Sequence, residues 1–543
     1  TKGLSSFSRG IGKLVPVDGN GAAVHVAYHM SEASLLYPIT PSTTMGETFD
    51  KWCSQGKKNV FNHVPTCRVL QSEAGAAGAL HGAAAVGTLC TTFTASQGLL
   101  LMIPNMLKTA GELWPVVFHV AARTVSTQAL SIQGDHADVM CVKNTGFAML
   151  SSSTVQECQD LAAIAHMSTI DSQIPFVHFF EGFRLSHEID SIEQLTPEEM
   201  KKLMPFEKLE QIRKRALNPA HPVALGHSQG ADAYFQTVEL YNKFYDQIPD
   251  IVEGNLKKFA DLTGRKYHIF DYYGHPEAED VIVMMGAGAT AVQECIDLMK
   301  GQKVGLIVPR LYRPWSIKHF LQVLPKSVKR VSIMDRSKDP AAPAEPLFMD
   351  VAYTLKQIGH PAKCFGGRYG LASRDFTPVH AKAIFDNMRS SKPKEKFTVG
   401  ITDDVTFLSL PPAKLEGFNK DNKTSQSIFW GLGGDGTIGC NKAAIKSCID
   451  EAHIYAQGYF AYSADKSNSL TRSYLRMSPE PIRAHYTISE ADFVGCTLPS
   501  YVNQYPMVDN LKEGGVFFLN FPRNDIEGLD KYLPAEFKDR KSV

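Results

Sequence analysis

Short apolar runs alternate with stretches rich in glycine and alanine between Gly19 and Pro175, and this alternation strongly limits the possible folds. Runs with the length of strands lie near Tyr37 and at residues 89–94, 116–121 and 176–180. Helices are expected after Asn20 and through Glu73–Val86, between those runs. Such alternation is typical of right-handed crossovers that build a parallel sheet covered by helices on both faces. The segment therefore predicts an α/β domain.

The rest of the chain repeats this type of pattern twice. A second α/β unit begins near Asp271 with VIVMMGAGATA, and a hydrophilic stretch at Lys414–Ser425 separates it from a third unit that begins SIFWGLGGDGTIG. Charged residues dominate the connection between Ser191 and Gln236. The fold class is α/β with several doubly wound parallel-sheet domains. The expected divisions are a basic N-terminal arm at 1–18, a first domain with a connecting arm at 19–270, a second domain at 271–424 and a third at 425–543.

Composition excludes several function classes. The 56 basic and 56 acidic side chains among 543 residues balance, so no global field attracts nucleic acid or an anionic membrane. No apolar run approaches the roughly 18 residues that a membrane-spanning helix needs. Ten dispersed cysteines never form CxxC, so we expect free thiols in a reducing compartment and no iron–sulfur cluster or structural zinc site here.

Four motifs lie in one order over fewer than a hundred residues. They are YPITPSTTMGE from Tyr37, QSEAGAAGALHG from Gln71, TTFTASQGLLLMIPNM from Thr91 and FHVAAR from Phe118. In these motifs the chain resembles the pyruvate:ferredoxin (flavodoxin) oxidoreductase family. The resemblance implies a thiamine-pyrimidine-binding-like first domain, a transketolase-C-terminal-like second domain and part of a Rossmann-like third domain. It covers nearly the whole chain.

The resemblance assigns roles to three residues of the first domain. It implies that Thr40 hydrogen-bonds the pyruvate, that Arg123 pairs with its carboxylate, and that Glu73 hydrogen-bonds the aminopyrimidine of thiamine diphosphate. Without it, Arg123 would be interpreted as a strand-end salt bridge, and Glu73 as an acid that offsets a helix dipole. Arg is suited to a carboxylate because its planar fork donates two parallel hydrogen bonds.

Two glycine-rich turns are candidate anion sites. Gly286, Gly288 and Ala291 form a GxGxxA sequence typical of dinucleotide binding, but the next strand ends without the expected acid, which leaves tight strand-to-helix packing as the alternative. The second turn contains Gly431, Gly433 and Gly436 before a helix.

Through the resemblance, this third domain is expected to help bind coenzyme A. The loop that follows would contribute Lys466 and Ser467. That loop reads DKSNS where the family has about KKSGG, so one cation has become an anion and two glycines have gained side chains.

Several other polar residues are interpreted as structural. His119 and His178 lie in apolar runs and are expected to be core histidines, and Asp135-His136-Ala137-Asp138 receives no role. Arg310, Tyr312 and Arg313 in RLYRP are expected to serve packing and interdomain contact.

Part of the resembled enzyme's machinery is expected outside this chain. The only GDG, at 434–436, lacks the Asn-containing turn that accompanies Mg²⁺-diphosphate binding. Thiamine diphosphate would thus be shared with another domain that also holds Mg²⁺. The leading hypothesis is the substrate-binding part of an oxidoreductase acting on pyruvate or another 2-oxoacid. It would be completed by the remaining domains or by a partner chain, in a dimer or larger assembly. The alternative is a non-catalytic paralogue or processed fragment with a scaffold role.

The first seventeen residues carry Lys2, Arg9 and Lys13 without an acid. They resemble the leader of a hydrogenosome or another mitochondrion-related organelle, and an ordinary basic terminus of a cytoplasmic protein is the alternative. Secretion is not expected.

Overall fold

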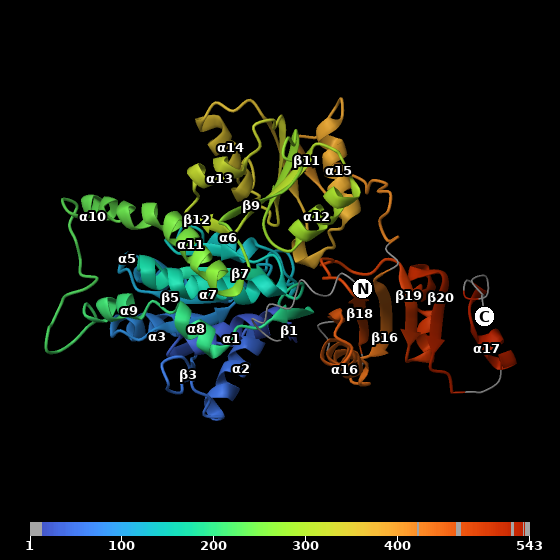
Figure 1. Cartoon of the computed structure of the whole chain (residues 1–543), viewed down its shortest axis with the longest axis horizontal. Coiled ribbons are helices and arrows are strands. Elements are labelled where there is room, and N and C mark those ends of the chain that lie inside the picture. The colour runs from blue at the N-terminus through green and yellow to red at the C-terminus, as the bar shows by residue number, and fades with distance from the viewer. Residues whose placement is uncertain (1–13, 421–422, 463–468, 523–525, 536, 538–543) are drawn as a thin grey trace. The chain divides into compact units, whose positions relative to one another are not determined.

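The computed structural model describes residues 14–420, 423–462, 469–522, 526–535 and 537 (Figure 1). These residues form two compact units. Unit 1 contains the described residues from Gly19 to Leu415 except 187–193, and unit 2 contains Leu14–Asp18, His187–Glu193 and the described residues from Glu416 onward. The α/β fold class predicted from the sequence is confirmed.

The first sheet of unit 1 has seven strands in the order β12-β6-β7-β5-β4-β2-β3. Its strands are β2 (Ala33–Leu36), β3 (Thr66–Val69), β4 (Cys90–Thr94), β5 (Val116–Ala122), β6 (Ala148–Ser151), β7 (Phe176–Glu181) and β12 (Leu311–Arg313). Every pairing is parallel except that of β12 with β6. Strands β4, β5, β6 and β7 are fully buried, as expected for a parallel sheet covered on both faces.

Two groups of helices pack with this sheet. One group is α1 (Gly19–Met30), α2 (Thr43–Ser54) and α7 (Val155–Ser172), and the other is α3 (Glu73–Ala85), α4 (Ser96–Leu101) and α5 (Ile103–Gly111). Helix α7 begins where the Thr154 side chain accepts a hydrogen bond from the Glu157 amide, which satisfies one of the amides left unpaired at a helix start. The remaining helices of this part are α6 (Ala137–Cys141), α8 (Pro197–Leu203), α9 (Phe206–Arg213), α10 (Tyr234–Leu240) and α11 (Asn242–Thr263).

The second sheet of unit 1 has six strands in the order β15-β14-β13-β10-β11-β9. They are β9 (Phe270–Gly274), β10 (Asp280–Met284), β11 (Val304–Pro309), β13 (Arg330–Asp335), β14 (Lys363–Arg368) and β15 (Lys396–Thr398). Only β9 is antiparallel to its neighbour. Figure 1 shows α13 (Ile317–Val323) and α14 (Pro346–Gln357) on one face, and α12 (Gly288–Leu298) and α15 (Pro378–Arg389) on the other. This sheet is doubly wound.

Unit 2 has one mixed sheet in the order β1-β8-β17-β18-β16-β19-β20. Its elements are β1 (Leu14–Asp18), β8 (Ile189–Glu193), β16 (Ser425–Leu432), α16 (Thr437–Asp450), β17 (Tyr455–Tyr462), β18 (Leu470–Ser478), β19 (Ala491–Cys496), β20 (Leu511–Leu519) and α17 (Ile526–Tyr532). Only the β16–β19 and β19–β20 pairings are parallel. Strands β17 and β18 are antiparallel because their connection is too short for the dozen or so residues that a parallel crossover needs.

Strands β1 and β8 belong to segments that the sequence analysis assigned to the N-terminal arm and the first domain. They pair with each other, and Ile189 of β8 pairs with Gly458 of β17. The sheet of unit 2 is therefore assembled from three separate stretches of chain. The divisions expected at 271 and 425 stay predictions.

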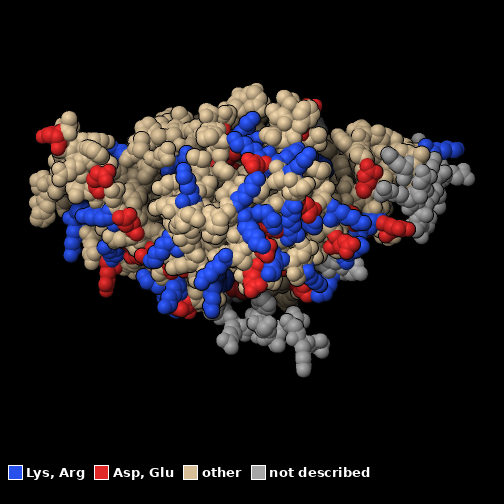
Figure 2. All heavy atoms as spheres, turned by 90° about the horizontal axis from the view of Figure 1, so that it is seen from above, with Lys and Arg blue, Asp and Glu red and all other residues tan. Residues whose placement is uncertain are grey.

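Three whole-chain expectations can be compared with the described residues. No helix in the described part of the chain is both long and apolar enough to cross a membrane. All ten cysteines are free thiols, with Cys141 and Cys440 exposed. On the face shown in Figure 2, basic side chains prevail and acidic ones lie among them, although the formal net charge of the chain is zero.

Candidate active site

The three residues singled out in the first domain all follow the carboxyl ends of parallel strands in the first sheet. Thr40 follows β2, Glu73 follows β3 as the first residue of α3, and Arg123 directly follows β5. In open α/β sheets, ligands bind at this edge because the loops from adjacent strands meet there. The topology thus brings the three residues to one edge of one sheet.

Arg123 and Thr40 are in direct contact. Arg123 Nη1 donates to the backbone oxygen of Thr40 at 2.8 Å, and Nε donates to the backbone oxygen of Ser131 at 3.3 Å. Arg123 is 7% exposed. Burial lowers the pKa of Arg123, which the charge of Asp138 opposes. Within the described ranges, Nη2 has no hydrogen-bond partner, so one terminal nitrogen of a guanidinium that stays protonated is available to a carboxylate.

Asp138 holds Arg123 in place, a role that sequence reasoning missed. Its Oδ2 accepts hydrogen bonds from the backbone amides of Ser96 at 2.7 Å and Arg123 at 3.0 Å, and its Oδ1 accepts from Val139 at 2.7 Å. Burial raises the pKa of Asp138 to about 7 even though these amides oppose the shift. One carboxyl group therefore ties the loop after β4 to the end of β5. The acid-rich DHAD segment was the available signal, but nothing in it points to partners 15 and 42 residues away.

Glu73 presents a nearly buried carboxylate beside a glycine. It is 8% exposed, and it has no hydrogen bond or ion pair with any residue that the structure describes. A Cβ added at Gly98 would lie 2.8 Å from Glu73 Oε1, so any larger residue at position 98 would collide with this carboxylate. The Thr94 hydroxyl, also buried, lacks a partner among the described residues. A carboxylate in this state suits a ligand that brings its own N–H donor.

Family models match three stretches of the chain. The model described as "Pyruvate flavodoxin/ferredoxin oxidoreductase, thiamine diP-bdg" matches residues 25–256, "Pyruvate:ferredoxin oxidoreductase core domain II" matches 278–381, and "Pyruvate ferredoxin/flavodoxin oxidoreductase" matches 426–542. The pyruvate:ferredoxin oxidoreductase of Moorella thermoacetica is 52% identical over 524 residues, which is 96% of this chain and 45% of the relative. The chain belongs to the pyruvate:ferredoxin/flavodoxin oxidoreductase family.

Other relatives agree with this family assignment. The mitochondrial pyruvate dehydrogenase (NADP(+)) of Euglena gracilis is 50% identical over 96% of this chain and 29% of the relative. The pyruvate-flavodoxin oxidoreductase of Enterobacter agglomerans is 48% identical over 97% of this chain and 45% of the relative. The chain spans less than half the length of these relatives.

A solved structure shares the fold at low sequence identity. It is the 2-oxoglutarate:ferredoxin oxidoreductase of Magnetococcus marinus with 2-oxoglutarate, coenzyme A and succinyl-CoA bound. It aligns with a TM-score of 0.52 and 17% identity, over 70% of this chain and 65% of that chain. This likeness supports the α/β architecture.

A side chain of the same chain, Glu181, fills the GxGxxA turn. Glu181, at the end of β7, accepts a hydrogen bond from the Ala287 amide at 3.0 Å, and a Cβ at Gly286 would lie 1.9 Å from its Oε1. Arg336 Nη1 at 3.3 Å and His136 Nε2 at 3.1 Å face the same oxygen. Burial works to raise the pKa of Glu181, but Arg336 and His136 lower it to about 2. An internal carboxylate thus stands where a dinucleotide phosphate would bind, and the packing alternative holds.

The second glycine turn also carries an internal carboxylate. Asp435 accepts hydrogen bonds from the amides of Thr437 and Leu432, both at 2.8 Å, close to the start of α16. Gly433 donates to the Ser469 backbone oxygen at 2.7 Å, and Gly436 has a φ of +88°. The Asp435 charge opposes an anion at this helix terminus, so this turn by itself fits the phosphates of coenzyme A poorly. Lys466 and Ser467 lie outside the described residues.

The core interpretation of His119 and His178 is confirmed, and both belong to a buried chain of hydrogen bonds. Ser152 Oγ donates to the Glu157 backbone oxygen at 3.1 Å, so it accepts from His178 Nε2 at 2.8 Å. His178 Nδ1 then accepts from His119 Nδ1 at 3.0 Å. His119 Nε2 in turn accepts from His166 Nε2 at 3.2 Å. Each neutral imidazole donates once and accepts once, except that Nδ1 of His166 has no partner within the described residues.

The RLYRP segment makes the structural contacts that were predicted. Arg310 pairs with Glu157 of α7 at 2.8 Å and with Asp271 of β9, so it links elements of the two sheets in unit 1. Arg313 pairs with Asp350 at 2.9 Å. Both arginines are thus held by ion pairs, although Arg310 Nε has no hydrogen-bond partner among the described residues.

A metal site was not expected in this chain. Among the described residues, no group of three or more His, Cys, Asp and Glu side chains could hold a metal ion. The expectation that another domain holds Mg²⁺ stays a prediction.

Proposed function

We propose that this chain is the substrate-binding part of a pyruvate:ferredoxin oxidoreductase. Such an enzyme oxidatively decarboxylates pyruvate or a related 2-oxoacid with coenzyme A to acetyl-CoA or its analogue, releases carbon dioxide and passes two electrons to a ferredoxin or flavodoxin. The observation that carries the proposal is the contact between Arg123 and Thr40, which leaves one guanidinium donor available at the carboxyl edge of the first sheet. The match of residues 25–256 to a model described as thiamine-diphosphate binding supports the same conclusion.

Each residue has a distinct task in this proposal. Arg123 binds the 2-oxoacid carboxylate with its free donor, and the Thr40 side chain, which is exposed at the same edge, orients the substrate. Glu73 accepts a hydrogen bond from the pyrimidine ring of thiamine diphosphate and holds or releases a proton there. Gly98 leaves room for the Glu73 carboxylate at this position. When bound, thiamine diphosphate supplies the nucleophilic carbon and the electron sink for decarboxylation.

The other cofactors are assigned outside the described site. We propose that Mg²⁺ and the iron–sulfur clusters belong to other domains or to a partner chain, within a dimer or larger assembly. Coenzyme A binding by the third domain would have to overcome the charge of Asp435, so it depends on donors outside the Gly431–Gly436 turn. A mitochondrion-related organelle is the compartment that we propose, since the relative from Euglena gracilis carries a mitochondrial name.

A Glu73→Gln variant of the native enzyme that contains this chain tests the catalytic role. We expect pyruvate decarboxylation to fall by about 100-fold or more, because general acid–base groups typically contribute that much. The matched control is Glu47→Gln, which changes an exposed acid of the same domain and should leave turnover unchanged. Equal turnover of both variants would refute the assignment of Glu73.

The negative charge of Asp435 in the third-domain turn favours a second candidate function, that of a scaffold paralogue without turnover. Intact-mass and peptide-mapping spectrometry of the native protein separates the two candidates. Peptides that continue past Val543 into sequence with cysteine clusters would support the enzyme. A native mass near 59.8 kDa would instead support a scaffold or a subunit completed by another chain.

A further inference from the structure

We propose that unit 1 contains a second binding site, for a small organic anion, at the carboxyl edge of its second sheet. The site is a cavity of about 470 Å³ between the loops that follow β13, β14 and β15. Small-molecule pockets usually have volumes of about 300–1,000 Å³. This inference does not depend on the proposed function.

The position of the cavity fits a ligand site. Lys338 comes from the loop after β13, residues 369–374 follow β14, and residues 399–406 follow β15. Loops from three adjacent parallel strands thus form one cavity at the sheet edge where α/β proteins bind ligands. The Gly286 turn at the same edge is closed by Glu181, so the cavity is a separate site beside it.

The loop after β14 is held in a strained conformation. Gly370 has a φ of +67°, and the non-glycine residues Ala372 and Ser373 have φ values of +50° and +57°. Non-glycine residues in this region cost roughly 1–3 kcal/mol each and persist where the surrounding structure enforces them, often at binding sites. Here the Ser373 amide donates to the Gly134 backbone oxygen at 2.7 Å, and Arg336 Nε donates to the Gly370 backbone oxygen at 3.1 Å.

The opposite wall is fixed by a single carboxylate. Asp403 accepts hydrogen bonds from the amides of Val405 at 3.1 Å, Thr406 at 2.9 Å and Leu408 at 3.1 Å. The Asp403 amide donates to Ser409 Oγ at 2.9 Å. Both walls are therefore held by the protein alone, and little ordering is left for a ligand to induce.

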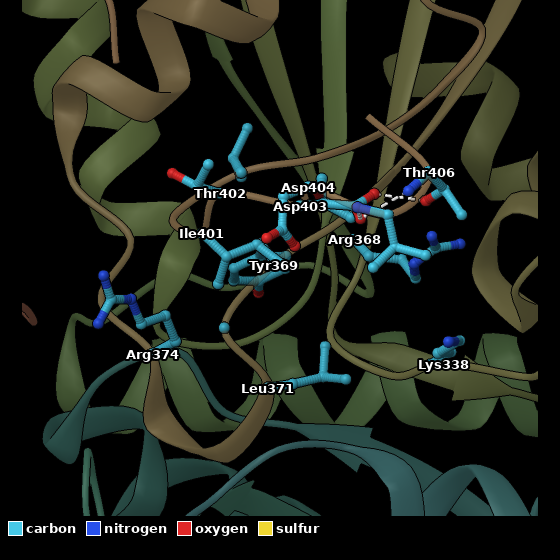
Figure 3. A pocket seen from close by; sticks show the side chains of 14 residues that line it. Lys338, Arg368, Tyr369, Leu371, Arg374, Ile401, Thr402, Asp403, Asp404 and Thr406 are labelled. Atoms are coloured by element: carbon cyan, nitrogen blue, oxygen red, sulfur yellow. Dashed lines mark hydrogen bonds between the residues drawn. The ribbon is translucent and has the colours of Figure 1, made fainter. Parts of the chain in front are cut away.

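Two cations on the cavity wall have unused donors. Figure 3 shows Arg374 and Lys338 on opposite sides of the cavity, with Tyr369 and Leu371 between them. Lys338 has no ion pair with a described residue. Arg374 donates through Nε to the Gly400 backbone oxygen at 2.6 Å, and its terminal nitrogens have no partner among the described residues.

The remaining charges decide which ligands fit. The third cation, Arg368, is paired with Glu345 at 3.0 Å. Asp403 keeps its negative charge, because hydrogen bonds from its own loop lower its pKa, but these bonds also occupy its oxygens. Asp404 is the lining acid that no hydrogen bond within the described ranges engages. An anion is therefore expected beside Lys338 or Arg374 and away from the two acids. Leu371, Val399 and Ile401 add an apolar surface. The expected ligand is a small molecule with an anionic group for one of the two cations, an apolar body, and a hydroxyl or amine that faces Asp404. Its anionic group is a carboxylate or a phosphate ester.

Isothermal titration calorimetry of the full chain tests this site. The probes are 4-hydroxyphenylacetate for carboxylates, adenosine 5′-monophosphate for phosphate esters and inorganic phosphate for the ion alone. We expect one organic probe to bind, and the double variant Lys338→Ala/Arg374→Ala to weaken that binding at least tenfold. The charge-matched control Lys300→Ala/Lys326→Ala, which removes two exposed cations of the same domain, should change it less than twofold.

Three results would overturn the proposal. They are no binding of either organic probe, equal losses in the two double variants, and inorganic phosphate binding as tightly as the organic probes. Circular dichroism and the unfolding midpoint check that the variants are folded. If the alanine variant is unfolded, Lys338→Gln/Arg374→Gln replaces it, with the same tenfold expectation.

Discussion

At the residue scale, the hydrogen bonds around Arg123 matter as much as its charge, because they fix the position of its guanidinium group. Two of its side-chain nitrogens are used on the backbone oxygens of Thr40 and Ser131, and its own amide is held by Asp138. The direction of the remaining donor is therefore set before any substrate arrives. A substitution that keeps the charge but changes the shape of the group, such as Arg to Lys, removes this preorganisation.

We expect Arg123→Lys to raise the KM for the 2-oxoacid by about 10- to 100-fold in the native enzyme, because an ammonium group cannot bond Thr40 and a carboxylate with the same planar fork. Steady-state kinetics with pyruvate measures this effect. Arg68→Lys, an exposed arginine on β3, is the control and should leave KM unchanged. A KM for the Arg123 variant within twofold of the original would contradict the proposed carboxylate contact.

At the element scale, the histidine chain makes β5, β7 and α7 sensitive to acid. Burial lowers the pKa of His166 and His178 to about 3, and burial together with His178 and His166 lowers that of His119 well below its usual value. The folded state keeps these rings neutral, whereas the unfolded chain binds protons below about pH 6.5. Their contribution to stability is complete above about pH 6.5 and declines as pH falls toward about 3.

We expect His166→Phe to make the unfolding free energy less dependent on pH. Between about pH 6 and 4, the slope should decrease by about 1.4 kcal/mol per pH unit, the value for one proton. Denaturant titrations at several pH values measure it. The substitution leaves His119 Nε2 without its donor, so a lower stability at pH 8 is also expected. Identical slopes would show that His166 is not neutral in the folded protein.

The sequence predicts the parallel sheets of unit 1 but not the pairing of β1 with β8. Alternation of apolar and small residues predicted the parallel sheets, because burial on both faces leaves a local signal in each strand. The same reasoning could not place β1 and β8, which pair in the sheet of unit 2. Asp138 and Glu181 were missed for a related reason: their partners are distant in sequence, and only the folded chain brings them together. The functional assignments of Thr40, Glu73 and Arg123 came from the family resemblance.

At the scale of the whole molecule, Glu181 joins the two sheets of unit 1. It lies at the end of β7 in the first sheet and bonds the turn before α12 and Arg336 after β13 in the second. Removing one partner of a buried pair leaves the other charge uncompensated, which costs about 3–5 kcal/mol. This contact therefore stabilises the arrangement of the two sheets, in addition to the apolar core.

We expect Glu181→Gln to destabilise unit 1 by about 3–5 kcal/mol and to speed amide exchange at residues 285–290 and 134–138. Thermal unfolding and hydrogen–deuterium exchange measure these effects. Glu198→Gln, at an exposed position on α8, should alter neither. Unchanged exchange at 285–290 in the Glu181 variant would mean that the turn does not depend on this carboxylate.

The Gly286 turn has a consequence for how this molecule responds to its surroundings. In a dinucleotide-binding protein, such a turn is filled by a diffusing ligand, so its occupancy follows the concentration of that ligand. Here the occupant is attached to the same chain, and its effective concentration is constant. The link between the two sheets therefore does not depend on a bound nucleotide, although the turn has the sequence of a dinucleotide-binding turn.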